Sequence, residues 1–327
     1  MSLQLLPRWI TVQRDEDPET VAFLSGAALA TLDTVLRDPN GTLPCALLRD
    51  RMAMDSAVAC LKLEGRNEPG SDIRDAVCLA RAGDRLGPAS EMFMGWRKLA
   101  RINLGVSGWM GRVENALPTA LAHEAVSILG SPSGRPCCID QLQLRALAHE
   151  AVSILGSPSG TPVGQASDIL AELLPRFPRE EAGALMLADV ALARAVGWDR
   201  PVPLLGAHMV RRDIRAIATG AGEPRLFVHR AMVAACDTAI RLAADLDLRV
   251  AKLRSVAPKL RAKGSDAALA LFLSHDAVSP SCMLSPMIQG TLMPMTDRAA
   301  RRLCDRLVEL GVVRELTGRP RFRLYGV

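Results

Sequence analysis

Arginine side chains gathered near the end of the chain are the residues whose types and spacing best suggest chemistry. Guanidinium groups stay charged and offer forked donors that match phosphate oxygens. Their arrangement predicts recognition of a polyanion, with nucleic acid as the leading choice. The candidate nucleic-acid-binding residues are Arg298, Arg301, Arg302, Arg306, Arg319, Arg321 and Arg323.

A helix over residues 297–310 is expected to carry the first four of these arginines. Thr296 is suited to cap its start, Asp297 favours the first turn, and Gly311 can end it. Helical spacing gathers the apolar residues on the opposite face; they are Ala299, Ala300, Leu303, Cys304, Leu307 and Leu310.

A β-hairpin is expected to carry the other three arginines. Its strands would span 312–316 and 321–325, joined by a turn over 317–320. Strand alternation places Phe322 and Leu324 on one face and Arg321, Arg323 and Tyr325 on the other. Helix and hairpin together predict a C-terminal winged-helix-like module.

The weak point of that prediction is the helix that should precede the recognition helix. Residues 277–294 include Pro280, Pro286 and Pro294, and proline breaks a helix interior. Only a short helical turn around 284–289 is therefore expected there.

Two functions are compatible with this module. The leading hypothesis is non-catalytic binding of double-stranded DNA, with the helix in the major groove and the hairpin on flanking phosphates. The alternative is a helical protein-interaction scaffold whose winged module docks protein rather than DNA. Arginines already paired with carboxylates of the chain would favour the scaffold.

No catalytic, cofactor or metal motif is recognisable in the sequence. Glycine-rich phosphate loops and dinucleotide fingerprints are absent, and no pair of acids stands out. His123-Glu124 and His149-Glu150 lack a second histidine one turn later, where Ser127 and Ser153 stand. No catalytic, cofactor-binding or metal-binding residue is therefore assigned. An enzyme is conceivable only if the helices form a pocket that no motif announces.

Composition predicts a mainly α protein, a helical bundle with a single β-hairpin. Hydrophobic residues make up 49% of the chain but aromatic residues only 3%, so Ala, Leu, Val and Met must fill the core. Residues 249–327 carry 14 Lys and Arg against 6 Asp and Glu, whereas the remainder carries 26 against 29. Positive charge therefore gathers at the end where a polyanion would bind.

A reducing cytoplasm is the expected location. The eight cysteines include no CxxC pair, so free buried thiols are expected rather than metal ligands or bridges. The first residues lack the pattern of a signal peptide, and no membrane-spanning run is evident, so no membrane partner is expected.

Four segments are expected along the chain. An N-terminal helical bundle covers 1–115, and a duplicated Ser/Pro/Gly-containing segment covers 116–162. A helical region with a long helix covers 163–264, and the winged-helix-like module covers 265–327. Fifteen residues at 120–134 recur unchanged at 146–160, and such identity indicates a recent duplication of coding DNA.

The long helix, expected over about 228–257, carries an apolar stripe at alternating spacings of three and four. Core packing within the chain is the commoner explanation, and a homodimer seam is the other. The stripe residues are Met232, Ala235, Ala239, Leu242, Leu246, Leu253 and Val256.

Four stretches of the sequence stand out together: VAFLSGAALATLD at 21–33, MLADVALARAVGW at 186–198, VAPKLRAKG at 256–264, and the terminal stretch 297–326. Together they resemble a bacterial family catalogued as domain of unknown function 1403. The resemblance covers most of the chain but implies no activity and transfers no site residue. The duplicated segment departs from the family pattern.

Overall fold

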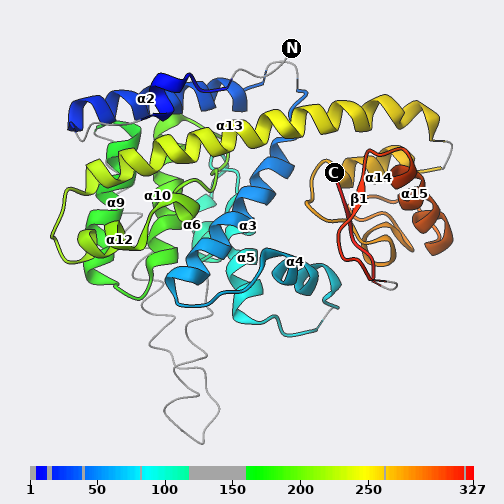
Figure 1. Cartoon of the computed structure of the whole chain (residues 1–327). Helices are drawn as coiled ribbons and strands as arrows, with labels where there is room; N and C mark the ends of the chain where they lie inside the picture. The colour runs from blue at the N-terminus through cyan, green and yellow to red at the C-terminus, as the bar shows by residue number, and fades with distance from the viewer. Residues whose placement is uncertain are drawn as a thin grey trace, which may run out of the picture.

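The computed structural model describes residues 5–12, 17–38, 41–81, 83–117, 160–260, 263–319 and 322–327. The protein is mainly helical, as predicted, and the sheet within these ranges is a single two-stranded antiparallel hairpin (Figure 1). Apart from its edges, the duplicated segment lies outside the described residues, together with His123 and His149.

The helices before residue 118 do not pack only with one another. α2 lies along the distant helix α13 (Pro224–Val256), as Figure 1 shows. α3 packs against α5 and against α11 (Leu205–His208). Asp17 starts α2 by accepting the Thr20 backbone N–H at 2.9 Å. The elements of this part are α1 (Arg8–Thr11), α2 (Pro18–Leu36), α3 (Cys45–Leu63), α4 (Gly70–Leu79), α5 (Pro88–Leu99) and α6 (Trp109–Glu114).

The second half supplies a helical layer and then the C-terminal elements. α9 and α10 pack side by side, and both α9 and the short α11 contact α13. In chain order they are α9 (Pro162–Arg176), α10 (Glu181–Val196), α11 (Leu205–His208), α12 (Arg211–Ala218), α13, the 3-10 turn η1 (Ala257–Lys259), α14 (Ser265–Phe272), the π-helical turn η2 (Pro280–Leu284), α15 (Asp297–Glu309), β1 (Arg314–Glu315) and β2 (Tyr325–Gly326).

Two hydrophobic cores organise these elements. The larger core runs from Leu6 to Leu246 and unites helices from both sides of the duplicated segment. Trp96 is fully buried in it, and a Cβ added to Gly206 would come within 2.6 Å of the Trp96 ring. That close approach requires glycine at the start of α11.

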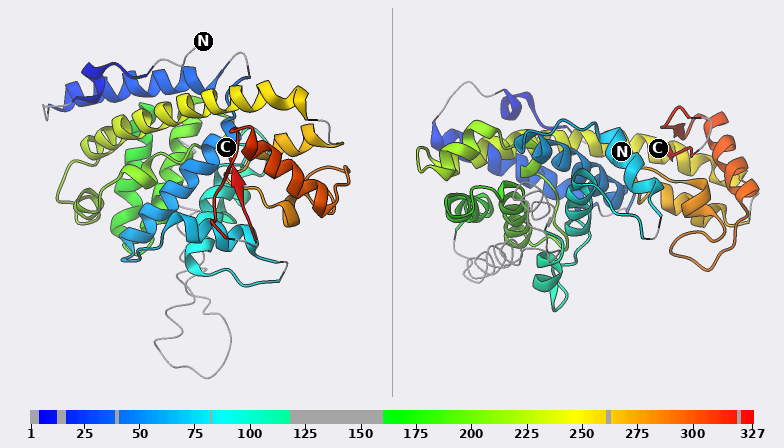
Figure 2. Two further views of the ribbon diagram at one scale, coloured as in Figure 1. Left: turned by 45° about the vertical axis from the view of Figure 1, so that its right-hand side comes forward. Right: turned by 90° about the horizontal axis from the view of Figure 1, so that it is seen from below.

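The smaller core belongs to the C-terminal elements and begins at Leu253, near the end of α13. We call residues 263–327 with η1 the C-terminal unit; it sits beside one end of α13 in each view of Figure 2. α13 has 33 residues, about 50 Å of helix, and contributes side chains to both cores.

The apolar stripe of α13 is buried inside the chain. Met232, Ala239, Leu246 and Leu253 have no exposed surface, so the stripe serves the core rather than a dimer seam. Leu248, on another side of the helix, is 62% exposed.

By length and composition, α2 is the one helix in the described ranges that could cross a membrane. In the structure it lies along α13 and buries Val21, Leu24, Ala28 and Leu32. Core helices of soluble proteins meet the same criteria.

The hairpin is shorter than the sequence predicts. β1 and β2 pair Arg314 with Gly326 and Glu315 with Tyr325, so strands over 312–316 and 321–325 were wrong in extent. Two local features shorten it. The Glu315 carboxylate accepts the backbone N–H groups of Thr317 and Gly318, which starts the turn early, and Phe322 has a φ of 57°, which interrupts the returning strand.

The faces expected in the returning strand were also wrong, because Phe322 and Arg323 are exposed whereas Leu324 and Tyr325 are buried. Tyr325 is buried and its backbone pairs with Val278, whereas Phe322 is 61% exposed. The short turn expected around 284–289 is found slightly earlier, as η2.

Candidate nucleic-acid interface

α15 forms where the sequence places it and presents its arginines outward. The Thr296 hydroxyl accepts the Ala299 backbone N–H at 3.3 Å, and Gly311 has the positive φ of 68° that suits a residue after a helix. Ala300, Leu303, Cys304 and Leu307 are buried, and burial raises the pKa of the Cys304 thiol to about 12. The four arginines on the other face are all exposed.

Three of these arginines share one row and line a groove with Lys259. Arg298, Arg302 and Arg306 are spaced by four, which stacks their side chains along one side of the helix. The groove has a volume of about 620 Å³, and its other lining residues are Leu260, Thr296, Ala299 and Leu303. We call it the α15 groove; among the residues that the structure describes, its lining holds four cations and no carboxylate.

The cations of the α15 groove are weakly tied to the chain. Within the described ranges, Arg298, Arg302 and Lys259 form no ion pair. Arg306 pairs with Glu309 at 3.0 Å, with both side chains more than half exposed. Such an exposed pair contributes little, so an incoming anion can replace it at small cost.

Arg301 and Arg323 face a different hollow, beside the hairpin. They line a volume of about 460 Å³ together with Asp305, Phe322 and Tyr325. Arg301 also pairs with Asp297 at 2.9 Å. Because Asp305 lies in the lining and Asp297 pairs with Arg301, this side of α15 is less attractive to a polyanion than the α15 groove.

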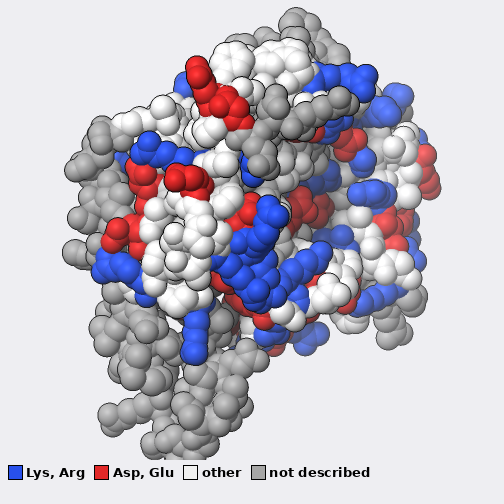
Figure 3. Space-filling model, turned by 60° about the vertical axis from the view of Figure 1, so that its left-hand side comes forward, with Lys and Arg blue, Asp and Glu red and all other residues white. Residues whose placement is uncertain are grey.

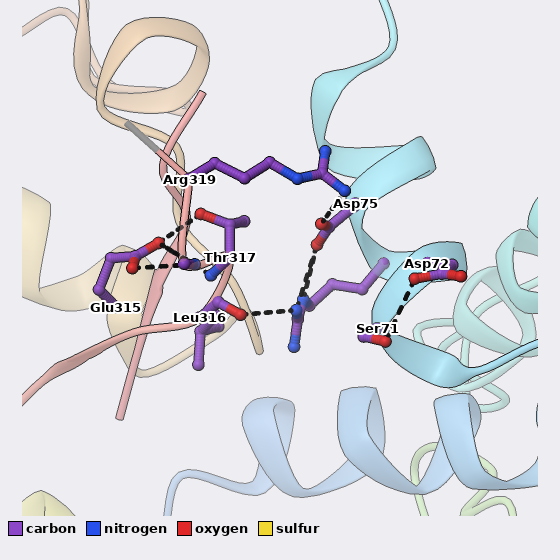
Figure 4. A network of polar contacts seen from close by, with 9 residues as sticks. Ser71, Asp72, Asp75, Glu315, Leu316, Thr317 and Arg319 are labelled. Atoms are coloured by element: carbon purple, nitrogen blue, oxygen red, sulfur yellow. Dashed lines mark hydrogen bonds and ion pairs between the residues drawn. The ribbon is translucent and has the colours of Figure 1, made fainter. Parts of the chain in front are cut away.

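Arg319 is directed into the chain's own bundle. Its guanidinium points toward the Asp75 carboxylate of α4 (Figure 4), and the two groups are 3.6 Å apart. Arg74 of the same helix pairs with Asp75 at 3.1 Å and donates to the Leu316 carbonyl at 3.4 Å. The hairpin is therefore docked on α4 rather than projecting as a free wing.

The seven arginines expected to act together thus divide among separate places. Arg298, Arg302 and Arg306 share the α15 groove, Arg301 and Arg323 share the hairpin hollow, and Arg319 meets α4. Arg321 lies outside the described residues. Sequence reasoning missed Lys259 as a site residue, although it stands in the basic stretch 259–264 that precedes α14.

Surface charge elsewhere is more mixed. The face that Figure 3 brings forward shows basic and acidic side chains interspersed, with one basic cluster near its centre. Among the described residues, no group of three or more His, Cys, Asp or Glu could hold a metal ion.

Comparison with known families identifies the chain. A family model described as "Protein of unknown function (DUF1403)" matches residues 1–327, the whole chain, so the protein belongs to this family. A search of curated proteins finds no match.

Proposed function

We propose that this DUF1403 protein binds double-stranded DNA without catalysing a reaction. The C-terminal unit would work as a winged-helix-like module, with α14, η2 and α15 as its helical part. The observation that supports the proposal best is the α15 groove, where Lys259, Arg298, Arg302 and Arg306 meet and no described lining residue is a carboxylate.

The groove suits a phosphate backbone for two physical reasons. Successive arginines on one row of a helix can contact successive phosphates, and each guanidinium can donate two parallel hydrogen bonds. Thr296 and Arg298 also stand at the N-terminal end of α15, where the helix dipole favours an anion. Both features act on phosphate charge and neither reads base sequence.

The docked hairpin limits which residues take part. Arg319 is engaged with Asp75, so the proposal rests on the helix rather than on a mobile wing. Arg301 and Arg323 flank the helix from the other side and would add secondary contacts. The proposed interface is therefore Arg298, Arg302, Arg306 and Lys259.

Fluorescence anisotropy with a labelled random-sequence duplex tests the proposal. The intact chain should bind at low salt, and four phosphate contacts give a slope of log K against log salt concentration of about −3.6. Changing Arg298 and Arg302 together to Ala should reduce the size of that slope by about 1.8. A matched Arg301→Ala variant, already paired with Asp297, should change it far less.

Two results would count against DNA binding. One is the absence of any anisotropy change at low salt with the intact, folded chain. The other is an equal loss of affinity in Arg301→Ala and in the double variant with Arg298 and Arg302 changed to Ala, which would indicate a diffuse charge effect. If the chain bound duplex RNA more tightly than duplex DNA, RNA would replace DNA as the proposed partner.

A protein-interaction scaffold is the second candidate, favoured by one observation. Leu292, in the loop before α15, is 93% exposed, and Met287 in the same loop is 48% exposed. A large apolar side chain in that position suits contact with protein, including a second copy of the chain. Sedimentation should then show a dimer that Leu292→Ser loses; a monomer at all concentrations would exclude self-association through this loop.

A further inference from the structure

A second arginine cluster surrounds a cavity of about 430 Å³ between the bundle and the C-terminal unit. Its walls come from the start of α3, the end of α5, the segment after α10 and the segment after α14. The lining residues that carry charge or hydrogen-bonding groups are Arg49, Asp50, Arg97, Arg101, Arg200, Ser274 and His275. Four arginines thus face one carboxylate.

That single carboxylate is already fully engaged. Asp50 is buried and accepts two hydrogen bonds from Arg97, at 2.6 and 3.2 Å. It also accepts one from Arg101 at 3.3 Å and one from the Asp276 backbone N–H at 3.1 Å. Asp50 therefore has no capacity left for the other two arginines, and the lining keeps an excess of positive charge.

Arg49 is the least satisfied of these cations. Its Nε is buried without a hydrogen-bond partner, and its Nη1 makes only a long contact of 3.4 Å to the Cys45 carbonyl. Burial lowers the pKa of Arg49, and burial and the neighbouring Arg97 lower that of Arg101. Asp199 acts on Arg49 electrostatically, but a desolvated guanidinium whose Nε has no hydrogen-bond partner stays unfavourable unless a further negative group supplies one.

We infer that this cavity is a binding site for a small phosphate ester. Guanidinium groups entering from α3, α5 and the segment after α10 can surround a tetrahedral group with several acceptor oxygens. Four arginines against Asp50, with Asp199 nearby, leave a net positive charge that suits a phosphate dianion better than a monocarboxylate. Ser274 also lines the cavity, but its hydroxyl is already engaged by the Ala270 carbonyl at 2.9 Å and by His275 Nδ1 at 2.9 Å.

The size and the remaining walls of the cavity indicate an ester rather than free phosphate. Its volume falls within the range of about 300 to 1,000 Å³ found for small-molecule sites. Ala46, Ala100 and Cys45 provide apolar surface beside the arginines, and burial raises the pKa of Cys45, which keeps it a neutral thiol. A compact organic group joined to phosphate would fill both parts.

This site is independent of the proposed DNA interface. No residue lines both the cavity and the α15 groove. Loss of phosphate-ester binding would therefore leave DNA affinity unchanged, and failure of either proposal would be visible without the other.

Calorimetric and thermal-shift titrations of the full chain in a phosphate-free buffer test the inference. The probes are glycerol 3-phosphate and inorganic phosphate, with succinate as a dianionic comparison and NaCl at matched ionic strength. Glycerol 3-phosphate should raise the melting temperature in a saturable way, above succinate and above the salt control. No rise beyond NaCl, or tighter binding of succinate than of both phosphate probes, would overturn it.

Three variants locate the effect. Arg49→Met, which keeps the length of the stem, and Arg200→Gln should each weaken glycerol 3-phosphate binding about tenfold to a hundredfold. Arg225→Gln, which removes an exposed cation of α13 outside the cavity, should leave it unchanged. Equal affinity in all three variants would contradict the assignment.

The melting temperature of Arg49→Met without ligand is a second measurement, and it distinguishes a binding arginine from one that only stabilises the fold. Without ligand its melting temperature should equal or exceed that of the parent chain, because a desolvated guanidinium with an unsatisfied Nε is removed. If Arg49→Met does not fold, the exposed Arg200→Gln decides the question alone. A lower melting temperature together with unchanged binding would show that Arg49 serves only the fold.

Discussion

The two arginine clusters of this protein differ in how far water has been removed from them. In the α15 groove, Arg298, Arg302 and Arg306 are exposed, lie in one row and belong to one helix. In the cavity beside Asp50, Arg49 and Arg97 are half-buried and come from different helices, whereas Arg101 and Arg200 are exposed. The same side chain therefore meets two electrostatic environments.

That difference decides which anion each cluster can hold. An exposed guanidinium group contributes little binding free energy with a single ion, because water and salt screen the interaction. Affinity must therefore come from many contacts along a polymer. Buried guanidinium groups interact strongly with a single compact charge but admit only what fits the walls. Water access, more than the number of arginines, separates a polymer-binding surface from a small-molecule site.

Removing Asp50 is expected to have the largest effect. Asp50→Ala deletes a buried acceptor of four hydrogen bonds and leaves Arg97 and Arg101 without their counter-ion. The free energy of unfolding, measured with urea, should fall by about 3–5 kcal/mol. Glu309→Ala, which breaks an exposed pair beside the α15 groove, should cost less than about 1 kcal/mol. Equal costs would remove the distinction between the two clusters.

Removing the cap of α15 should have a smaller effect that is centred on the groove. Thr296→Ala deletes the hydrogen bond to the Ala299 N–H and should lower the free energy of unfolding by about 1 kcal/mol. Thr296→Ser keeps a hydroxyl and should retain most of that stability. Amide hydrogen exchange should increase in the first turn of α15 in the alanine variant; unchanged exchange would show that neighbouring contacts hold this end.

Releasing the hairpin from α4 should cost less again. Arg319→Ala removes a long ion pair whose arginine is 56% exposed, so the free energy of unfolding should change by less than about 1 kcal/mol. Arg225→Ala removes a pair of similar length, with Asp168, and is the matched control. Faster proteolysis near residues 316–319 should distinguish the two variants. The Arg74 contact to Leu316 would explain an absence of any difference.

The smallest expected effect is a pH dependence confined to the cavity. Burial, followed by repulsion from Arg97 and Arg101, lowers the pKa of His275 below its usual value of 6.5. The unfolded chain therefore takes up a proton first as pH falls, so this contribution to stability is present above about pH 6.5 and declines below it.

His275→Gln should make the fall in unfolding free energy between pH 7 and pH 5 less steep. DNA affinity through the α15 groove should not follow this transition, because Lys and Arg do not titrate there. Unfolding titrations at several pH values measure the first effect and anisotropy measures the second. Identical pH profiles for parent and variant would place the titration elsewhere.

Local signals in the sequence were enough to place α15 but not the hairpin. Thr296, Gly311 and the apolar spacing between them correctly predicted where the helix begins and ends, because caps and periodicity act within a few residues. The strands predicted for the hairpin were too long, because the Glu315 carboxylate and the backbone of Phe322 shorten the observed hairpin. Alternation of residue types predicts neither feature.

The cavity could not have been predicted from the chain alone. Arg49, Arg97, Arg200 and His275 stand in four separate segments, and no spacing relates them. They meet because α3 packs on α5 and because Arg51 holds Asp276 at 2.8 Å and the Val327 carbonyl at 2.6 Å. Only tertiary contacts bring these residues together.

The continuity of α13 fixes the relative orientation of the two clusters. Each residue of an α-helix advances the chain by about 1.5 Å and turns it by about 100°. One residue inserted between Leu246 and Leu253 would therefore swing the C-terminal unit a quarter-turn or more around the bundle, pulling Asp276 from Arg51 and opening the cavity wall. The number of residues in α13 therefore sets the direction in which the α15 groove faces relative to the bundle while Arg51 holds Asp276.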